Sequence, residues 1–499
     1  MDMPLNDTPR IPNPRRRRRT KMQIFKEAYL PTIILAVTVV MIIVFIIGAA
    51  VSGKDPQPSL PSGSTDNPGT SSTQKPGTTE KPTDSTDKPT SPTDSTPGST
   101  GPQPPSDELI NEAHAILKQA NKLAASHDYE GAIAVLESFS GDMNIFVDLK
   151  HAHQEYTAIL ENMVAWNAGD VVNLSFQLLI ADPDRAFVDP EYKNSYKNNF
   201  ITVHEFSAIL QQLYDNGYVL VSLDDFYTQV YNTSSGRYIY KENQLLLPAG
   251  KKPIMLTETN ANYYTYMVDS NSDGKPDAGA DGFACRLAFD GTNFYNELVN
   301  ADGSVSTGAY DMVPILENFI QAHPDFSYKG ARAIVAFSGY DGVLGYRINS
   351  PILSADELKA ERDGAAATVE ALQNAGYDLA CYTYNNYNYS MLTPSRVQED
   401  IQNWLEQIAP WIGNLDILVY AKDADIAGEE SYSGNSKFNV LHNAGFRFFL
   451  GVSTSPWNQV DDQYVRHNRL SLSGSNLLNN PELFEGLFDP ATVLDSARP

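Results

Sequence analysis

Short apolar runs alternate with amphipathic stretches from Val171 to the end of the chain, and this alternation constrains the fold more than any other feature. The short runs have the length and the Val, Ile, Phe and Tyr content of β-strands, and the longer stretches place apolar residues at helical spacing. Strands are expected at 172–180, 218–221, 253–256, 333–337, 379–382, 416–420 and 446–452, and helices at 203–216, 360–375, 401–411 and 437–444. Strands that alternate with helices predict an α/β domain with a parallel sheet, closed or nearly closed. Functional side chains are expected at the carboxyl ends of such strands.

A different pattern precedes this domain. From Asp107 to about Trp166, apolar residues recur at spacings of three and four, which predicts helices. One helix, a short break and a second helix that opens on Tyr129-x-x-Ala132 look like a single tetratricopeptide-like hairpin. Because one such repeat does not make a stable solenoid, we interpret residues 107–168 as a small helical stalk domain.

The N-terminus predicts a membrane anchor. Residues 28–53 contain no charged side chain, and roughly 20 apolar residues suffice to span about 30 Å of hydrocarbon. Eight basic and three acidic residues precede this run, and such an excess of positive charge stays on the cytoplasmic side. We therefore predict a basic cytoplasmic tail at 1–27, a single-pass signal-anchor at 28–53 in the cell membrane, and an extracellular remainder. The alternative is a cleaved signal peptide, whose apolar region usually runs about 7–15 residues.

Residues 54–106 are almost entirely Pro, Ser, Thr, Gly, Asp and Lys, a composition that predicts a disordered linker. The whole chain has a net charge of −25, and the segment before the apolar run is positive by five, so the remainder carries −30. An ectodomain so acidic argues against nucleic acid and polyanionic glycans as partners, and is compatible with a neutral or cationic cell-envelope polysaccharide.

Several segments of the predicted α/β domain resemble one family. They are FSAILQQLYDNGYVLVSLDD at 206–225, GYDGVLGYR at 339–347, NAGFRFF at 443–449 and LDSARP at 494–499. On these segments, residues 169–499 resemble the exported polysaccharide deacetylases with a NodB-homology domain, a carbohydrate esterase family. The resemblance implies a distorted (β/α) barrel of about seven strands and the removal of acetyl groups from N-acetylated sugars.

The resemblance also implies a metal site, and this sequence departs from it. The family carries a base aspartate next to a metal-binding aspartate, and two metal-binding histidines at i and i+4. The matching positions here are Thr259, Asn260, Tyr382 and Asn386. Threonine is no base near neutral pH, asparagine amides are poor zinc ligands, and the reference pKa of tyrosine is near 10. No remaining histidines are spaced as a ligand pair, so catalytic zinc is not expected and the site is predicted to be degenerate.

A sugar-binding cleft is the function that survives this loss. Tyrosines and asparagines at strand ends suit stacking on sugar faces and hydrogen bonding to hydroxyls, although each tyrosine taken alone fits packing between barrel and helices equally well. The predicted glycan contacts are Gln177, Glu258, Tyr263, Tyr264, Tyr384, Asn385, Tyr387 and Trp457. Glu258 and Asp423 are also acidic groups near the degenerate positions, which keeps residual acid–base chemistry open.

One further motif is independent of the family. Residues 269–277 match the first nine positions of a calcium loop, with alanine at position 12 and an aspartate directly after it. We predict a structural calcium ion, with a polar surface turn as the alternative; the residues concerned are Asp269, Asn271, Asp273, Lys275, Asp277 and Asp281. Cys285 and Cys381 form either one disulfide or two buried thiols.

Three functions follow from the sequence. The first is a membrane-tethered, catalytically degenerate deacetylase homologue that binds peptidoglycan or exopolysaccharide. The second is an active N-deacetylase with an unrecognised metal set, and the third is an adhesion or adaptor protein that works through its helical stalk.

Overall fold

The computed structural model of the chain describes residues 105–189, 191–268 and 281–499. The predicted cytoplasmic tail, the signal-anchor and nearly all of the linker lie outside these ranges and stay predictions. None of the helices within the described ranges combines the length and the apolar character that a bilayer crossing requires.

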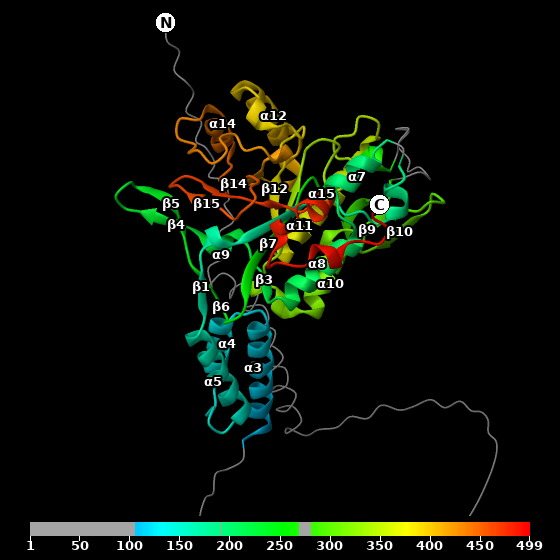
Figure 1. Cartoon of the computed structure of the whole chain (residues 1–499). Helices are drawn as coiled ribbons and strands as arrows, with labels where there is room; N and C mark the ends of the chain where they lie inside the picture. The colour runs from blue at the N-terminus through cyan, green and yellow to red at the C-terminus, as the bar shows by residue number, and fades with distance from the viewer. Residues whose placement is uncertain (1–104, 190, 269–280) are drawn as a thin grey trace, which may run out of the picture. The chain divides into compact units, whose positions relative to one another are not determined.

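Three helices open the described chain, at α3 (Asp107–Ala125), α4 (Tyr129–Glu137) and α5 (Val147–Glu161), and they pack against one another (Figure 1). Ser106 caps α3 by accepting a hydrogen bond from Leu109 N, and Asp128 caps α4 by accepting from Gly131 N. Small residues bring the helices close together, and their shared core consists mainly of Ala113, Ala120, Ala132, Leu136 and Leu149. The predicted helices are confirmed between Asp107 and Glu161, whereas Val164–Trp166, which was also expected to be helical, forms the short strand β1.

The turn between α3 and α4 contacts the segment that precedes strand β11 (Ile334–Phe337). His127 Nε2 lies 2.7 Å from Asp325 O, and Lys329 N donates to Ser126 O at 2.7 Å. Lys329 Nζ also lies 3.3 Å from Asp128 Oδ1, so one loop of the helical region is joined to the α/β domain by backbone and side-chain contacts.

The α/β domain is built on one large parallel sheet. Its strands are hydrogen-bonded in the order β16 (Val465–His467), β14 (Phe448–Leu450), β13 (Ile417–Val419), β12 (Asp378–Cys381), β11 (Ile334–Phe337), β7 (Lys252–Glu258) and β2 (Val172–Phe176). Two short strands extend it: β3 (Tyr218–Leu220), parallel to β7, and β15 (Asn458–Val460), antiparallel to β16. Parallel strands are covered on both faces, which explains why they occur as continuous apolar runs in the sequence.

The sheet is curled, and one bent segment connects its two ends. β16 pairs with β14 at Val465↔Phe448, whereas β17 (Leu470–Ser471), three residues further on, pairs with β2 at Leu470↔Leu174. The α/β class and the curled parallel sheet predicted from the sequence are confirmed.

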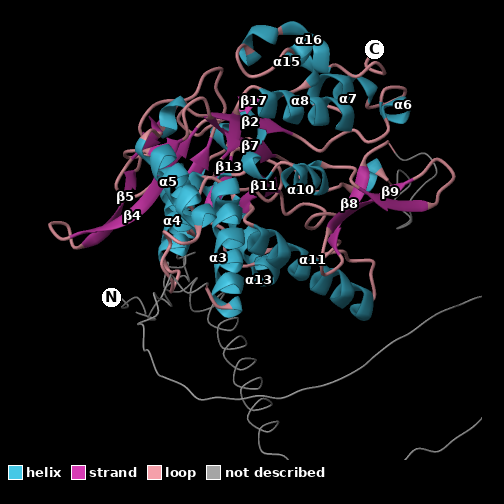
Figure 2. Ribbon diagram, turned by 90° about the horizontal axis from the view of Figure 1, so that it is seen from below, coloured by secondary structure: helices cyan, strands magenta, loops and turns pink. Residues whose placement is uncertain are grey.

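Helices cover the outer face of this sheet, as Figure 2 shows for α8 and α10 beside β2, β7 and β11. The covering helices are α8 (Val203–Asp215), α10 (Met312–Ala322), α11 (Ala355–Ala375), α12 (Pro394–Gln407) and α14 (Ser436–Ala444). Alternate residues of β7 face opposite sides, because side chains along a strand alternate. Ile254 and Leu256 lie in the large core between sheet and helices, and Met255 lies in the smaller core that the curled sheet encloses.

Several elements were not predicted from the sequence. They are the hairpin β4 (Tyr227–Asn232) and β5 (Arg237–Glu242), the antiparallel sheet β8 (Ala284–Phe289), β9 (Phe294–Val299) and β10 (Val305–Gly308), the pair β1 (Val164–Trp166) and β6 (Leu245–Leu247), and the short helices α6 (Pro183–Ala186), α7 (Lys193–Asn199), α9 (Leu223–Phe226), α13 (Ala409–Ile412), α15 (Gly474–Asn479) and α16 (Pro490–Val493). The strand expected at 172–180 is shorter than predicted and ends at Phe176. Beyond it the backbone leaves the ladder, and Leu179 N donates to Asp311 Oδ1 at 3.0 Å instead.

Candidate functional site

The degenerate positions lie where β7 and β12 end, at the same edge of the sheet. Thr259 follows β7 and is buried, and its N and Oγ1 both donate to Phe176 O, at 2.7 and 3.0 Å. Tyr382 follows β12, is also buried, and lies beside Thr259. These two predicted site residues are therefore in contact.

The phenol of Tyr382 stays protonated near neutral pH. Burial, with the charge of Asp423 as the second cause, raises the pKa of Tyr382 to about 12, and the Arg469 charge and the Lys422 backbone oppose this rise. A protonated phenol is a poor substitute for the imidazole expected at this position.

The two asparagines at this edge have left-handed backbones, with φ of 60° at Asn260 and 55° at Asn386, a conformation that asparagine adopts more readily than most residues. The Tyr264 hydroxyl donates to Asn260 Oδ1, so this amide oxygen already has a partner. Asn386 Oδ1 is buried without a hydrogen-bond partner among the described residues.

This set of side chains does not fit a catalytic zinc ion. A hydroxyl, a protonated phenol and two carboxamides replace the carboxylates and imidazoles that zinc prefers. In the described ranges, no three His, Cys, Asp or Glu side chains lie close enough together to hold a metal ion.

Arg469 is the charged residue of this edge that the sequence did not single out. It is 1 % exposed, it lies between β16 and β17, and its guanidinium donates to Ser175 Oγ at 2.5 Å and Tyr420 O at 3.3 Å. Asp423, which the sequence did suggest, lies 3.4 Å away and is half exposed. In the sequence Arg469 follows the polar stretch Arg466-His467-Asn468, and nothing there marks it as a site residue.

Glu258 lies on the opposite face of β7 from Thr259, because side chains alternate along the strand. It is 1 % exposed and packs beside Asp311, the residue that caps α10 and accepts from Leu179 N and Met312 N. Tyr263 is equally buried, and its hydroxyl accepts from Asn296 Nδ2. Glu258 and Tyr263 are core residues in this structure, so neither can contact a glycan as predicted.

Replacing Glu258 with glutamine is expected to stabilise the protein increasingly as pH rises. Burial raises the pKa of Glu258 well above its usual 4.5, and Asp311 adds to the effect. A raised folded-state pKa gives stability that is complete below the unfolded pKa and is lost as pH rises through the folded pKa. Glutamine cannot ionise, so it removes the cost of keeping the buried carboxyl protonated, and that cost grows as pH rises above the unfolded-state pKa. Urea unfolding at pH 5 and pH 8 measures the difference, and an equal gain at both pH values would contradict the prediction.

The remaining predicted glycan contacts differ in what holds them. Tyr264 is buried against Asn260, whereas Asn385 Nδ2 donates to Asp400 at 2.6 Å and helps fix the loop after β12. Tyr384 is half-buried, and its hydroxyl donates to Gln407 Oε1 at 2.6 Å. Among the predicted contacts only Tyr387 is exposed, with 39 % of its surface accessible.

Gln177 directly follows β2 and is half-buried, on the same edge as Thr259. Trp457 precedes β15 and is partly covered by the Arg466 guanidinium, 4.8 Å above its ring. Both residues keep part of their surface accessible.

Most of the predicted calcium ligands lie outside the described residues, and the calcium ion stays a prediction. Asp281 is described and is buried, where it accepts from the Tyr196 hydroxyl. Burial raises the pKa of Asp281 to about 6. Cys285 and Cys381 are free thiols, and the alternative of a disulfide between them is not seen.

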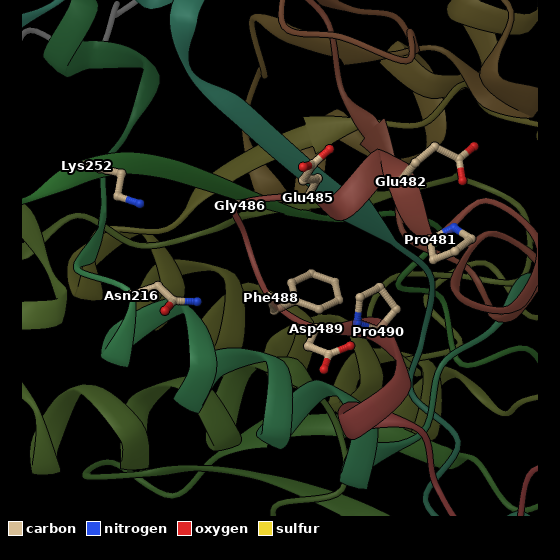
Figure 3. A pocket seen from close by; sticks show the side chains of 9 residues that line it. All are labelled: Asn216, Lys252, Pro481, Glu482, Glu485, Gly486, Phe488, Asp489 and Pro490. Atoms are coloured by element: carbon tan, nitrogen blue, oxygen red, sulfur yellow. The ribbon is translucent and has the colours of Figure 1, made fainter.

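An open hollow of about 500 Å³ lies at the other end of β7, around Lys252 and Phe488 (Figure 3). Asn216 Nδ2 donates to Leu487 O at 2.9 Å beside it, and the Tyr218 hydroxyl donates to Gly486 O at 3.0 Å. The hollow therefore follows the seam where the C-terminal segment packs on the domain, away from the degenerate positions.

The chain matches no family model and no curated protein. It is similar to the solved structure of the Streptococcus pyogenes deacetylase PplD in complex with acetate, with 10 % sequence identity and a TM-score of 0.32 over 63 % of this chain and 98 % of that chain. It is also similar to the BpsB deacetylase domain from Bordetella bronchiseptica, with 12 % identity and a TM-score of 0.31 over 62 % of this chain and 97 % of that chain. At these values the likeness carries no conclusion about reaction or ligand.

Proposed function

We propose that this chain is a membrane-tethered homologue of the polysaccharide deacetylases that binds an N-acetylated cell-envelope polysaccharide and does not hydrolyse it. The binding site lies at the carboxyl ends of β7, β11 and β12. The N-terminal apolar segment anchors the protein, and the acidic linker and domain face the cell envelope.

The chemistry at the strand edge carries this proposal. Hydrolysis of an acetamide needs a base to take a proton from water and a group that stabilises the developing negative charge. The Thr259 hydroxyl donates to Phe176 O, and Tyr382 holds its own proton, so neither serves as that base. Without carboxylates or imidazoles at these positions, a metal ion that could activate water has no ligands there.

The same edge keeps groups that suit sugar hydroxyls and acetamides. Asp423 is half exposed beside Arg469, which offers a carboxylate acceptor next to a guanidinium donor. Both members of this pair act electrostatically on Tyr382, and sites for small polar ligands typically combine such convergent polar groups with aromatic walls.

An active deacetylase remains the competing function, and the observation that favours it is Asp423, an exposed carboxylate near Tyr382. The test uses the full-length protein in detergent, with metal analysis, acetyl release and binding measured on the same preparation. The probes are N-acetylglucosamine oligomers and soluble peptidoglycan fragments. We expect binding without acetate release, and the same absence of release in Asp423→Asn.

Stoichiometric metal together with acetate release would overturn the inactivity. Failure to bind any of these glycans would overturn the binding function.

A further inference from the structure

We propose that four tyrosines at the strand edge form one continuous aromatic strip along which an extended polysaccharide chain lies, so that the protein recognises several consecutive sugars rather than a single unit. The rings that a ligand can reach are Tyr192, Tyr266 and Tyr340, and the buried ring of Tyr264 joins Tyr266 to Tyr340 from beneath. The inference rests on the proposed glycan-binding function and adds to it the length and course of the ligand.

The rings contact one another in sequence. The centroids of Tyr192 and Tyr266 are 5.4 Å apart, those of Tyr266 and Tyr264 are 5.7 Å apart, and those of Tyr264 and Tyr340 are 6.1 Å apart. Tyr264 and Tyr266 are stacked, with 16° between their planes. A row of rings this long matches a chain of sugars better than one sugar.

The strip is open to solvent where a ligand would reach it. Tyr266 is 43 % exposed and Tyr340 is 58 % exposed, and Tyr192 is half-buried. Five tyrosines in the described ranges are exposed, and three of them follow the carboxyl ends of β7, β11 and β12; these three are Tyr266, Tyr340 and Tyr387. Exposed tyrosines therefore concentrate on the edge that carries the degenerate positions.

The loops that carry these rings are fixed before any ligand binds. Thr265, between the two stacked tyrosines, donates through N and Oγ1 to the Asp341 carboxylate at 2.5 and 2.9 Å. Arg347 donates to Asp341 O at 2.7 Å and to Tyr263 O at 2.5 Å. Rings that are already held in place lose little conformational entropy when a ligand binds. A surface of fixed rings therefore binds a ligand at a lower entropic cost than a mobile one.

The strip passes the degenerate site itself. The Tyr264 hydroxyl donates to Asn260 Oδ1 and lies 3.2 Å from Ser338 Oγ. A sugar held beside Asn260 would therefore place its neighbours along Tyr266 and Tyr192 on one side or over Tyr340 on the other.

The chemistry of the strip selects a neutral chain. Tyrosine rings stack on the apolar faces of pyranoses, and their hydroxyls bond to sugar hydroxyls. The carboxylates of Asp189 and Glu191 act electrostatically on Tyr192 and would repel a polyanion. An uncharged N-acetylated polysaccharide fits these conditions.

The experiment measures the affinity of the full-length protein in detergent for β-1,4-linked N-acetylglucosamine dimer and hexamer by calorimetry. We expect the hexamer to bind at least about tenfold more tightly than the dimer. Tyr266→Ala and Tyr340→Ala should each lower hexamer affinity by about tenfold and leave dimer affinity nearly unchanged. Tyr266→Phe keeps the ring and should retain the hexamer affinity.

Tyr231→Ala is the matched control, because Tyr231 is 56 % exposed but lies on the β4–β5 hairpin. It should bind the hexamer like the unaltered protein. Equal affinity for dimer and hexamer, or unchanged hexamer binding by both Tyr266→Ala and Tyr340→Ala, would overturn the strip and leave the proposed function standing. No binding of either oligomer or of soluble peptidoglycan by the unaltered protein would overturn both.

Discussion

Returning two aspartates and two histidines to the strand edge is expected to raise the zinc affinity of the protein by about a thousandfold, or about 4 kcal/mol. The variant is Thr259→Asp, Asn260→Asp, Tyr382→His and Asn386→His. Its physical reason is that one carboxylate and two imidazoles complete a three-ligand zinc site, whereas the natural side chains are neutral oxygens. Equilibrium dialysis against a zinc buffer at pH 7.5 measures the change.

The backbone conformation at two of these positions is compatible with the substitutions. Asn260 and Asn386 both have positive φ, and aspartate and histidine tolerate that conformation better than most residues. Tyr382→His alone is the control and should gain little affinity, since a single imidazole does not hold zinc. If the fourfold variant folds, as its circular dichroism would show, and still binds no more zinc than the natural chain, the assignment of these positions to one site is wrong.

Much of the fold follows from the sequence because buried parallel strands are apolar throughout. The strands near 253–256, 379–382 and 416–420 lie within one or two residues of their expected places. The β4–β5 hairpin was missed because its strands, YTQVYN and RYIYKE, contain neither a continuous apolar run nor a regular alternation of polar and apolar residues. The β8–β10 sheet was missed for a related reason, since it lies in a long insertion between β7 and α10 that shows no helical spacing.

The candidate site was predicted in part. Thr259 and Tyr382 meet because the carboxyl ends of parallel strands lie at one edge, and the sequence supports that inference. Arg469 could not be placed, because its partner Ser175 is 294 residues away along the chain. Glu258 could have been placed correctly, since a residue next to Thr259 on a strand must face the other side.

The aromatic strip shows what sequence alone leaves undecided about tyrosines. Tyr263 and Tyr264 are buried, whereas Tyr266 in the same segment is exposed. The segment after β7 is not a regular strand, so no simple period assigns its side chains to one face. The hydrogen bonds from Thr265 to Asp341 decide the outcome, and they depend on the loop after β11.

Arg498→Ala is expected to destabilise the protein by about 3–5 kcal/mol, because it leaves the Glu205 carboxylate buried without its cation. Arg498 Nε and Nη2 each lie 2.6 Å from a different oxygen of Glu205, and the two side chains are 2 % and 0 % exposed. Glu205 is also the residue that completes the capping box of α8 with Thr202. Arg498 therefore joins the segment 494–499 to the start of a core helix.

Urea unfolding of Arg498→Ala and of Arg396→Ala separates the effect of burying an ion pair on stability from the effect of forming one. Arg396 and Glu399 are also 2.6 Å apart but are 58 % and 60 % exposed, so their loss should cost less than about 1 kcal/mol. Replacing both Arg498 and Glu205 with methionine should recover much of the loss, since no charge is then left buried. If Arg498→Ala costs no more than Arg396→Ala, the buried pair does not hold the segment 494–499 on the domain.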